Sequence, residues 1–241
     1  MASPSISVFF PCYNDEKTIG KLVKDSITTL EKLTNNYEVI VVNDGSSDGS
    51  LALLRKLQKK HPVLKVVNHR KNKGYGGALI SGFKKSSKKL VFYTDGDGQY
   101  DVKELPILLK LMTPDVDFIN GIKMTRHDAT YRIIVGNLYS LVIRWGFWLP
   151  IMDVDCDFRL IRRSIIKKIK LQSTSGSICV ELVKKAQRAG ANFRQVSVHH
   201  YNRKWGESQF FVPRRILRTF WDLGGLWLRL MIKDPLSKKA K

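Results

Sequence analysis

Short apolar runs alternate with helical patterns through the first half of the chain, and each run ends in polar residues. The runs are residues 6–10, 39–42, 64–67 and 90–93. Apolar side chains recur at helical spacing after the first two runs; the two sets are Ile19, Leu22, Val23, Ile27, Leu30 and Leu33, then Leu51, Leu54 and Leu57. This alternation predicts βαβ units in an α/β fold, whose ligands bind at the carboxyl ends of the strands.

Two carboxylates, Asp95 and Asp97, directly follow the apolar run 90–93. A hard divalent cation prefers oxygen ligands and usually takes one or two protein carboxylates together with substrate phosphates. The pattern therefore indicates a Mg²⁺ or Mn²⁺ site, which Gln99 and Asp101 could extend. Asp and Gly also serve ordinary turns, so the neighbouring motifs must decide between a metal site and a loop.

A glycine-rich segment, residues 72–78 (NKGYGGA), precedes a short predicted helix that runs through Phe83. Glycines at a helix start permit close approach of the backbone to a phosphate or a sugar. The segment lacks both the Gly-x-Gly-x-x-Gly spacing and the Gly-Lys-Ser/Thr of a P-loop. Taken alone, it suits a tight strand-to-helix turn equally well.

Five motifs occur in a fixed order between about residues 6 and 208. They are PCYNDE at 11–16, VNDGSSDG at 42–49, NKGYGGA at 72–78, DGDGQ at 95–99, and the pair DVDCDFR at 153–159 with RKWGES at 203–208. The ordered set resembles the inverting nucleotide-sugar glycosyltransferases of family 2. Within them it resembles the dolichol-phosphate mannosyltransferase-like branch, which uses polyprenyl phosphates. The resemblance implies a GT-A (Rossmann-like) fold with a central, mostly parallel sheet flanked by helices.

The resemblance also implies roles for individual residues. The nucleotide-sugar pocket would contain Pro11, Tyr13, Glu16, Asp44, Lys73, Gly74 and Asp95, with Asp44 reading the base. Asp95, Asp97 and Gln99 would hold Mg²⁺ or Mn²⁺ on the diphosphate, and the catalytic set would be Asp95, Asp97 and Arg203. The acceptor phosphate would meet Lys123, Arg132, Arg203 and Ser208, beside an acceptor loop that carries Asp153, Asp155, Asp157 and Arg159.

Two positions depart from the family pattern. Asn43 stands where many relatives have a second acid, and Lys123 stands where the mannosyltransferase has an arginine. Arginine forms a bidentate fork on phosphate, whereas lysine supplies a point charge. Which nucleobase the protein selects is therefore open at Asn43, and how tightly it binds phosphate is open at Lys123.

The acceptor decides whether the reaction needs a general base. A lipid monophosphate is already anionic near neutral pH, so it can attack the anomeric carbon without losing a proton to the enzyme. A hydroxyl acceptor would need a base, and Asp153, Asp155 and Asp157 are the clustered acids late in the chain. A loop-ordering role is favoured for these three acids over that of a base.

Composition favours an anionic partner, because 42 Lys and Arg against 21 Asp and Glu give a formal charge of +21. No helix-turn-helix, zinc-finger spacing or RRM signature is present, so no specific nucleic-acid partner is expected. A non-catalytic basic module that binds membranes or nucleic acid is the alternative from a different class. The acids at 95 and 97, together with Gln99, argue against that alternative.

Membrane contact is indicated near the end of the chain by an amphipathic pattern. One predicted helical face holds Ile216, Leu217, Phe220, Trp221, Leu223, Trp227, Leu230 and Met231, and the other holds Arg215, Arg218, Asp222, Arg229 and Lys233. This pattern is typical of an interfacial helix, although packing on the domain's own core would give the same periodicity. We expect a catalytic domain over 1–210 and a basic membrane-interface helix and tail over 211–241.

A second apolar stretch, residues 133–152, is interrupted by Gly136, Asn137, Gly146 and Pro150, and carries Arg144 in its middle. A central arginine costs at least about 2.5 kcal/mol on insertion scales, so this stretch is interpreted as a buried or interfacial helix beside the acceptor site. Relatives often carry C-terminal membrane spans. The protein is therefore expected either to be peripheral or to depend on an anchor that is missing or that a small membrane subunit supplies.

Three scattered cysteines, and no apolar signal segment ahead of Ile6, indicate a reducing compartment. His199 and His200 are adjacent in a predicted strand at 196–201 and point to opposite faces, which favours a structural role over metal binding. The hypothesis is a glycosyltransferase peripheral to the cytoplasmic face of a membrane. It would move a hexose, with inversion, from a GDP-mannose or UDP-glucose type donor to dolichyl or undecaprenyl phosphate.

Overall fold

A computed structural model describes residues 3–124, 140–203, 205 and 213–233. The sheet has seven strands in the order β3-β2-β1-β4-β6-β5-β7. The strands are β1 (Ile6–Cys12), β2 (Tyr37–Asn43), β3 (Leu64–Asn68), β4 (Leu90–Tyr93), β5 (Phe118–Lys123), β6 (Arg159–Arg162) and β7 (Phe193–Val198). Only β6 runs against the others, because it pairs antiparallel with both β4 and β5 whereas every other pair is parallel.

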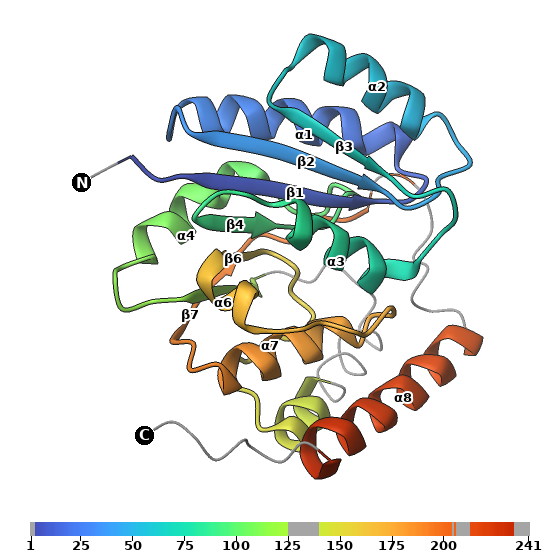
Figure 1. Cartoon of the computed structure of the whole chain (residues 1–241), viewed down its shortest axis with the longest axis vertical. Helices are drawn as coiled ribbons and strands as arrows, with labels where there is room; N and C mark the ends of the chain where they lie inside the picture. Colours follow the sequence, from blue (N-terminus) through green and yellow to red (C-terminus); the bar gives the residue numbers. More distant parts are fainter. Residues whose placement is uncertain (1–2, 125–139, 204, 206–212, 234–241) are drawn as a thin grey trace.

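Helices cover both faces of this sheet. They are α1 (Glu16–Glu31), α2 (Ser50–Lys60), α3 (Gly74–Lys85), α4 (Leu105–Leu111), α6 (Arg163–Lys168), α7 (Ile178–Arg188) and α8 (Pro213–Trp227), with a 3₁₀ turn at Val102–Glu104 and a π-helical turn at Leu228–Lys233. Residues 140–147 are also helical. In Figure 1, α1 and α2 lie above the sheet, whereas α3, α6 and α7 lie below it.

Two apolar cores result from this arrangement, since successive strand residues point to opposite faces. Val8 and Phe10 of β1 pack into the core shared with α1 and α2, and Phe9 packs into the core shared with α3 and α7. All seven residues of β1 are buried, as expected of a central parallel strand. The four strands predicted from apolar runs are confirmed, since each run lies within β1, β2, β3 or β4.

The predicted C-terminal helix is present as α8, but its predicted apolar face is divided between two environments. Leu223, Leu226 and Leu230 are buried in the second core, together with Ile143 and Phe147 of the helix at 140–147. Packing on the domain's own core, the alternative interpretation, is therefore correct for part of the helix, because these residues recur at spacings of three and four.

Other large apolar residues of this region face solvent. Those of α8 and the turn that follows it are Phe220, Trp221, Trp227, Leu228 and Ile232. The side chains of Arg215, Ile216 and Leu217 lie outside the described part of the chain. Within the described residues, no helix is both long and apolar enough to cross a membrane.

Candidate active site

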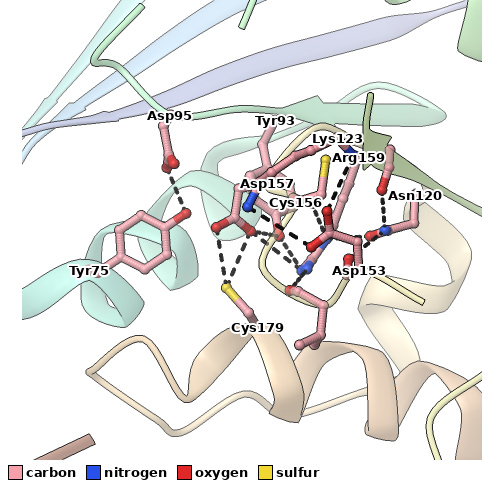
Figure 2. A network of polar contacts seen from close by, with 12 residues as sticks. Tyr75, Tyr93, Asp95, Asn120, Lys123, Asp153, Cys156, Asp157, Arg159 and Cys179 are labelled. Atoms are coloured by element: carbon pink, nitrogen blue, oxygen red, sulfur yellow. Dashed lines mark hydrogen bonds and ion pairs between the residues drawn. The ribbon is translucent and has the colours of Figure 1, made fainter. Parts of the chain in front are cut away.

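The two acids of the predicted metal site lie in the turn that follows β4. Tyr75 donates a hydrogen bond from its hydroxyl to Asp95 Oδ1 over 2.7 Å, and the pair is seen in Figure 2. Asp97 Oδ1 accepts a hydrogen bond from the backbone N–H of Gln99, and Asp97 Oδ2 accepts one from Arg203. A Cβ at Gly96 would lie 2.4 Å from the carbonyl oxygen of Pro11, so only glycine lets this turn pass the end of β1.

Burial raises the pKa of Asp95 well above its ordinary value, and the charges of Asp157 and Asp97 act in the same direction. A buried carboxyl of this kind ionises readily only when a cation lies beside it. Among the described residues there is no cluster of three or more His, Cys, Asp or Glu that could hold a metal. Two carboxylates fit a Mg²⁺ or Mn²⁺ ion whose other ligands come from substrate phosphates and water.

Gln99 connects the turn after β4 to the segment that follows β7. Its backbone carbonyl accepts a hydrogen bond from Tyr201 N (2.8 Å), and its side-chain Nε2 donates to the carbonyl oxygen of Tyr201 (3.1 Å). This two-bond bridge brings Arg203 to Asp97. The metal-ligand role predicted for Gln99 would use its amide oxygen, not the nitrogen that the bridge engages, and it stays a prediction.

The predicted nucleotide pocket lies at the carboxyl ends of β1 and β2. Pro11 is buried at the end of β1, and the neighbouring Tyr13 is exposed. Glu16 accepts a hydrogen bond from Gly49 N (3.0 Å), while its own backbone N–H donates to Asp48 (3.1 Å). The carboxylate of Glu16 thus holds the loop after β2 against the start of α1.

Asp44 is buried, and it connects the loop after β2 to the loop after β3. Its Oδ1 lies 2.6 Å from His69 Nδ1 and accepts a hydrogen bond from Lys73 N over 2.9 Å. The other ring nitrogen of His69 lies 2.9 Å from Ser81 Oγ. His69 was not predicted from the sequence, although its place one residue after β3, at the edge where ligands bind, was a usable signal.

The glycine-rich segment packs closely against the protein's own backbone. Gly76 N donates to the carbonyl oxygen of Thr174 (2.9 Å), and a Cβ at Gly74 would lie 2.4 Å from that same oxygen. Gly74 also has φ +80°, which an L side chain rarely adopts. The close approach expected toward a phosphate is therefore made toward residues 173–174, and the tight-turn interpretation describes these two glycines.

The acceptor-loop residues are held by Arg159, which is fully buried at the start of β6. Its guanidinium donates to Tyr93 OH (2.7 Å), to Asn120 Oδ1 (2.8 Å) and to the carbonyl oxygens of Val154 and Cys156. Figure 2 shows this network running from β4 and β5 into the loop before β6. Five donors in a fixed fork suit such a set of acceptors, which a lysine could not replace.

Two of the three acids in this loop are engaged inside the protein. Asp157 accepts hydrogen bonds from Tyr93 OH and from the thiol of Cys179, both at 3.2 Å. Asp153 accepts one from Lys123 N (3.2 Å), and Lys123 Nζ lies 3.9 Å from its other oxygen. These contacts agree with a loop-ordering role for Asp153 and Asp157.

Asp155 differs from the other two acids, because it is partly exposed. Burial nevertheless raises the pKa of Asp155 to about 6, while Lys123 acts to lower it. Arg132 and Ser208 of the predicted acceptor-phosphate set lie outside the described residues. Tyr75, Tyr93, Asn120 and Cys179 contact site residues and were not found from the sequence, since their partners are remote along the chain.

The chain is similar to known transferases in sequence. It is 26% identical over 220 residues to undecaprenyl-phosphate 4-deoxy-4-formamido-L-arabinose transferase of Pseudomonas syringae pv. syringae (strain B728a), an alignment that covers 90% of this chain and 64% of that protein. The chain thus spans less than two thirds of the length of this relative.

Two solved structures share the fold. Glucosyl-3-phosphoglycerate synthase from Mycobacterium tuberculosis, crystallised with Mn²⁺, UDP and phosphoglyceric acid, has a TM-score of 0.72 at 16% identity, covering 94% of this chain and 79% of the other. The mannosyltransferase PcManGT from Pyrobaculum calidifontis, crystallised with GDP-Man and Mn²⁺, has a TM-score of 0.67 at 18% identity, covering 94% and 64%. At these identities, the likeness shows the expected GT-A-like fold.

The family model of glycosyl transferase family 2 matches residues 7–170, which include the turn with Asp95 and Asp97 and the Arg159 network. The match covers more than half of the chain, so this protein belongs to glycosyl transferase family 2.

Proposed function

We propose that this protein transfers a hexose, with inversion, from a nucleotide sugar of the GDP-mannose or UDP-glucose type to a polyprenyl phosphate. The observation that carries the proposal is the contact of Arg203 with Asp97. This contact supports the proposal because Arg203, the cation predicted to meet the acceptor phosphate, lies beside one of the acids that follow β4. The relative that acts on undecaprenyl phosphate supports the acceptor class.

Asp95 and Asp97 would hold Mg²⁺ or Mn²⁺, which when bound offsets the charge of the departing nucleoside diphosphate. Tyr75 keeps the carboxylate of Asp95 in one orientation through its hydrogen bond. Lys123 and Arg203 supply positive charge for the acceptor phosphate. The phosphate oxygen attacks the anomeric carbon as the bond to the diphosphate breaks, and no proton has to be removed.

Transfer to a hydroxyl acceptor is the second candidate function, and the partial exposure and the pKa of Asp155 favour it. Asp155 is the partly exposed acid of the loop, and its pKa of about 6 suits a general base near neutral pH. Transfer from the sugar donor to a hydroxyl would make Asp155 indispensable, whereas transfer to a phosphate would not.

The location we propose is the cytoplasmic face of a membrane, where the protein is peripheral or held by a further segment or a small membrane subunit. A lipid-linked acceptor and a formal charge of +21 support this location. The alternative of a basic module without catalysis is set aside, because the chain belongs to glycosyl transferase family 2.

The test is transfer from labelled GDP- and UDP-sugars to dolichyl or undecaprenyl phosphate in detergent, with Mn²⁺, Mg²⁺ or EDTA. Asp97→Ala should abolish a metal-dependent lipid product. The matched control is Asp115→Ala, because Asp115 is an exposed acid in the loop before β5 and lies outside the proposed site. Donor binding or hydrolysis without any lipid product would overturn the lipid-phosphate acceptor.

A further inference from the structure

A surface cavity of about 390 Å³ lies where the chain enters β4 and where β6 ends. Leu90 at the start of β4 is paired with Arg162, the last residue of β6. Tyr93 at the end of β4 is paired with Arg159, which belongs to the network of the candidate active site. Four residues of extended strand span roughly 10–13 Å. The cavity is therefore at the opposite edge of the sheet and separate from the candidate active site.

Most of the residues that line this cavity are cationic. The cations are Lys88, Lys89, Arg162, Arg163 and Lys167, and the lining also includes Ser87 and Ser164. Among the described residues, the lining thus offers positive charge and hydroxyl groups but neither an acid nor an aromatic ring. Like charges gathered in one cavity repel one another, so the arrangement favours an occupant that is itself multiply negative.

The two arginines of the cavity are held in place by backbone carbonyl groups. Arg162 donates from Nε to the carbonyl oxygen of Val116 and from Nη2 to that of Thr113, both over 2.7 Å. Arg163 donates from Nε to the carbonyl oxygen of Ser86 over 2.9 Å. A guanidinium has five N–H donors, so each arginine retains donors beyond those that the carbonyl groups take. A side chain held in this way loses little conformational entropy when it binds an anion.

Two nearby acids do not cancel the positive charge of the cavity. Asp117 Oδ1 lies 3.7 Å from Arg162 Nε, which is an ion pair of loose geometry. Glu38 is buried and accepts two hydrogen bonds from Ser87, and its other carboxylate oxygen lies 2.5 Å from the ammonium group of Lys65. The charge of Glu38 is therefore already balanced by a lysine outside the cavity, and the lining keeps a clear positive excess.

We infer that this cavity binds a soluble anion that carries two or more linked phosphate groups. Phosphate oxygens match both the guanidinium fork of arginine and the ammonium group of lysine, and the volume lies within the range of small-ligand sites. The described lining offers no aromatic ring on which the bases of a nucleic acid could stack, and no large apolar side chain that could enter a bilayer. The site does not depend on the proposed function.

The test is isothermal titration calorimetry of the full chain with sodium pyrophosphate in EDTA, which removes divalent metal from the active site. Lys89→Gln combined with Lys167→Gln should weaken binding by roughly tenfold or more, because two charge-assisted hydrogen bonds are lost. Both lysines are exposed, so the double variant should keep the melting temperature of the unaltered chain. The matched control, Lys24→Gln with Lys56→Gln, removes the same charge from exposed positions on α1 and α2 and should keep the affinity.

Arg203→Met separates the cavity from the active site, and this variant should bind pyrophosphate as tightly as the unaltered chain does. Loss of binding in Arg203→Met, with full binding in the double lysine variant, would assign the anion to the active site and overturn the inference. Equal weakening in the double variant and in the matched control would overturn it in favour of net charge alone. Inorganic phosphate should bind more weakly than pyrophosphate, because it reaches fewer of the cations, and equal affinities would overturn the preference for linked phosphates.

Discussion

Arg203 donates a hydrogen bond from its guanidinium to Asp97 Oδ2 over 2.5 Å, although 106 residues separate the two in sequence. The Gln99–Tyr201 bridge holds the two segments together beside this ion pair. A guanidinium on the carboxylate competes with any other cation for the same oxygen. Under the proposed function, the carboxylate of Asp97 and a substrate phosphate are alternative partners of the Arg203 guanidinium.

Arg203→Met is expected to strengthen Mn²⁺ binding in the absence of nucleotide by roughly threefold to tenfold, because a competing positive charge is removed. Free Mn²⁺ can be measured by electron paramagnetic resonance. Arg55→Met, which removes an equal charge from α2, should leave the affinity unchanged. An unchanged or weaker affinity in Arg203→Met would show that the ion pair does not limit metal binding.

Arg159→Met is expected to lower the free energy of unfolding by about 3–5 kcal/mol, because buried Asp157 loses its guanidinium partner and the carbonyl groups of Val154 and Cys156 lose their donor. Urea unfolding measures the change. Asp157→Asn in the same chain should recover part of the loss, since the uncompensated charge is then gone. A loss below about 1 kcal/mol would contradict the structural role given to Arg159.

Asp155→Asn separates the two acceptor classes. With a phosphate acceptor, the variant should keep transfer within roughly tenfold of the unaltered rate, because no base is needed. With a hydroxyl acceptor, transfer should be lost while nucleotide-sugar binding persists. The rate of the unaltered enzyme should then also fall as the pH drops below about 6, where Asp155 becomes protonated.

Glu38 provides a pH-dependent contribution to stability remote from the site. Burial would raise its pKa, but hydrogen bonds from Lys65, Ser7 and Ser87 outweigh burial and lower the pKa from 4.5 to about 2. The folded state therefore binds this proton less readily than the unfolded chain does. The resulting stabilisation is present above about pH 4.5 and is lost as the pH falls toward 2.

Glu38→Gln should accordingly lower the free energy of unfolding at pH 7 by ~2 kcal/mol and by much less near pH 3. Urea unfolding at the two pH values measures both differences. Glu31→Gln, on the exposed surface of α1, is the control and should change little at either pH. A Glu38→Gln effect that is equal at both pH values would assign the loss to packing instead of charge.

The sequence predicted the parallel half of the sheet well, because strands buried on both faces are continuous apolar runs. It did not predict β6, whose four residues Arg159–Arg162 begin and end with arginine. A fully buried arginine contradicts the usual preference of charged residues for the surface, and only the surrounding carbonyl groups explain it. The strand predicted at 196–201 lies at Phe193–Val198, so His199 and His200 follow it.

The candidate site could be located from the sequence but not assembled. Motifs placed Asp95, Asp97 and Arg203 in one site, and the structure brings Arg203 to Asp97. The pairing of Asp157 with Cys179, and of Asp44 with His69, depends on how α7 and β3 are arranged around the sheet. Nothing local in the sequence specifies such pairings, because each partner would be equally acceptable in an ordinary helix or loop.

The reversed direction of β6 has a consequence for how this protein can diversify. Lys123 ends β5 and Arg159 begins β6 at the same edge of the sheet, beside Tyr93 at the end of β4. The chain therefore leaves β5 and enters β6 at one edge, so the sheet does not restrict the length of the connection between these two strands. Under the proposed function, this connection can lengthen or be replaced to suit another acceptor, while the strands that precede Asp44 and Asp95 keep their arrangement.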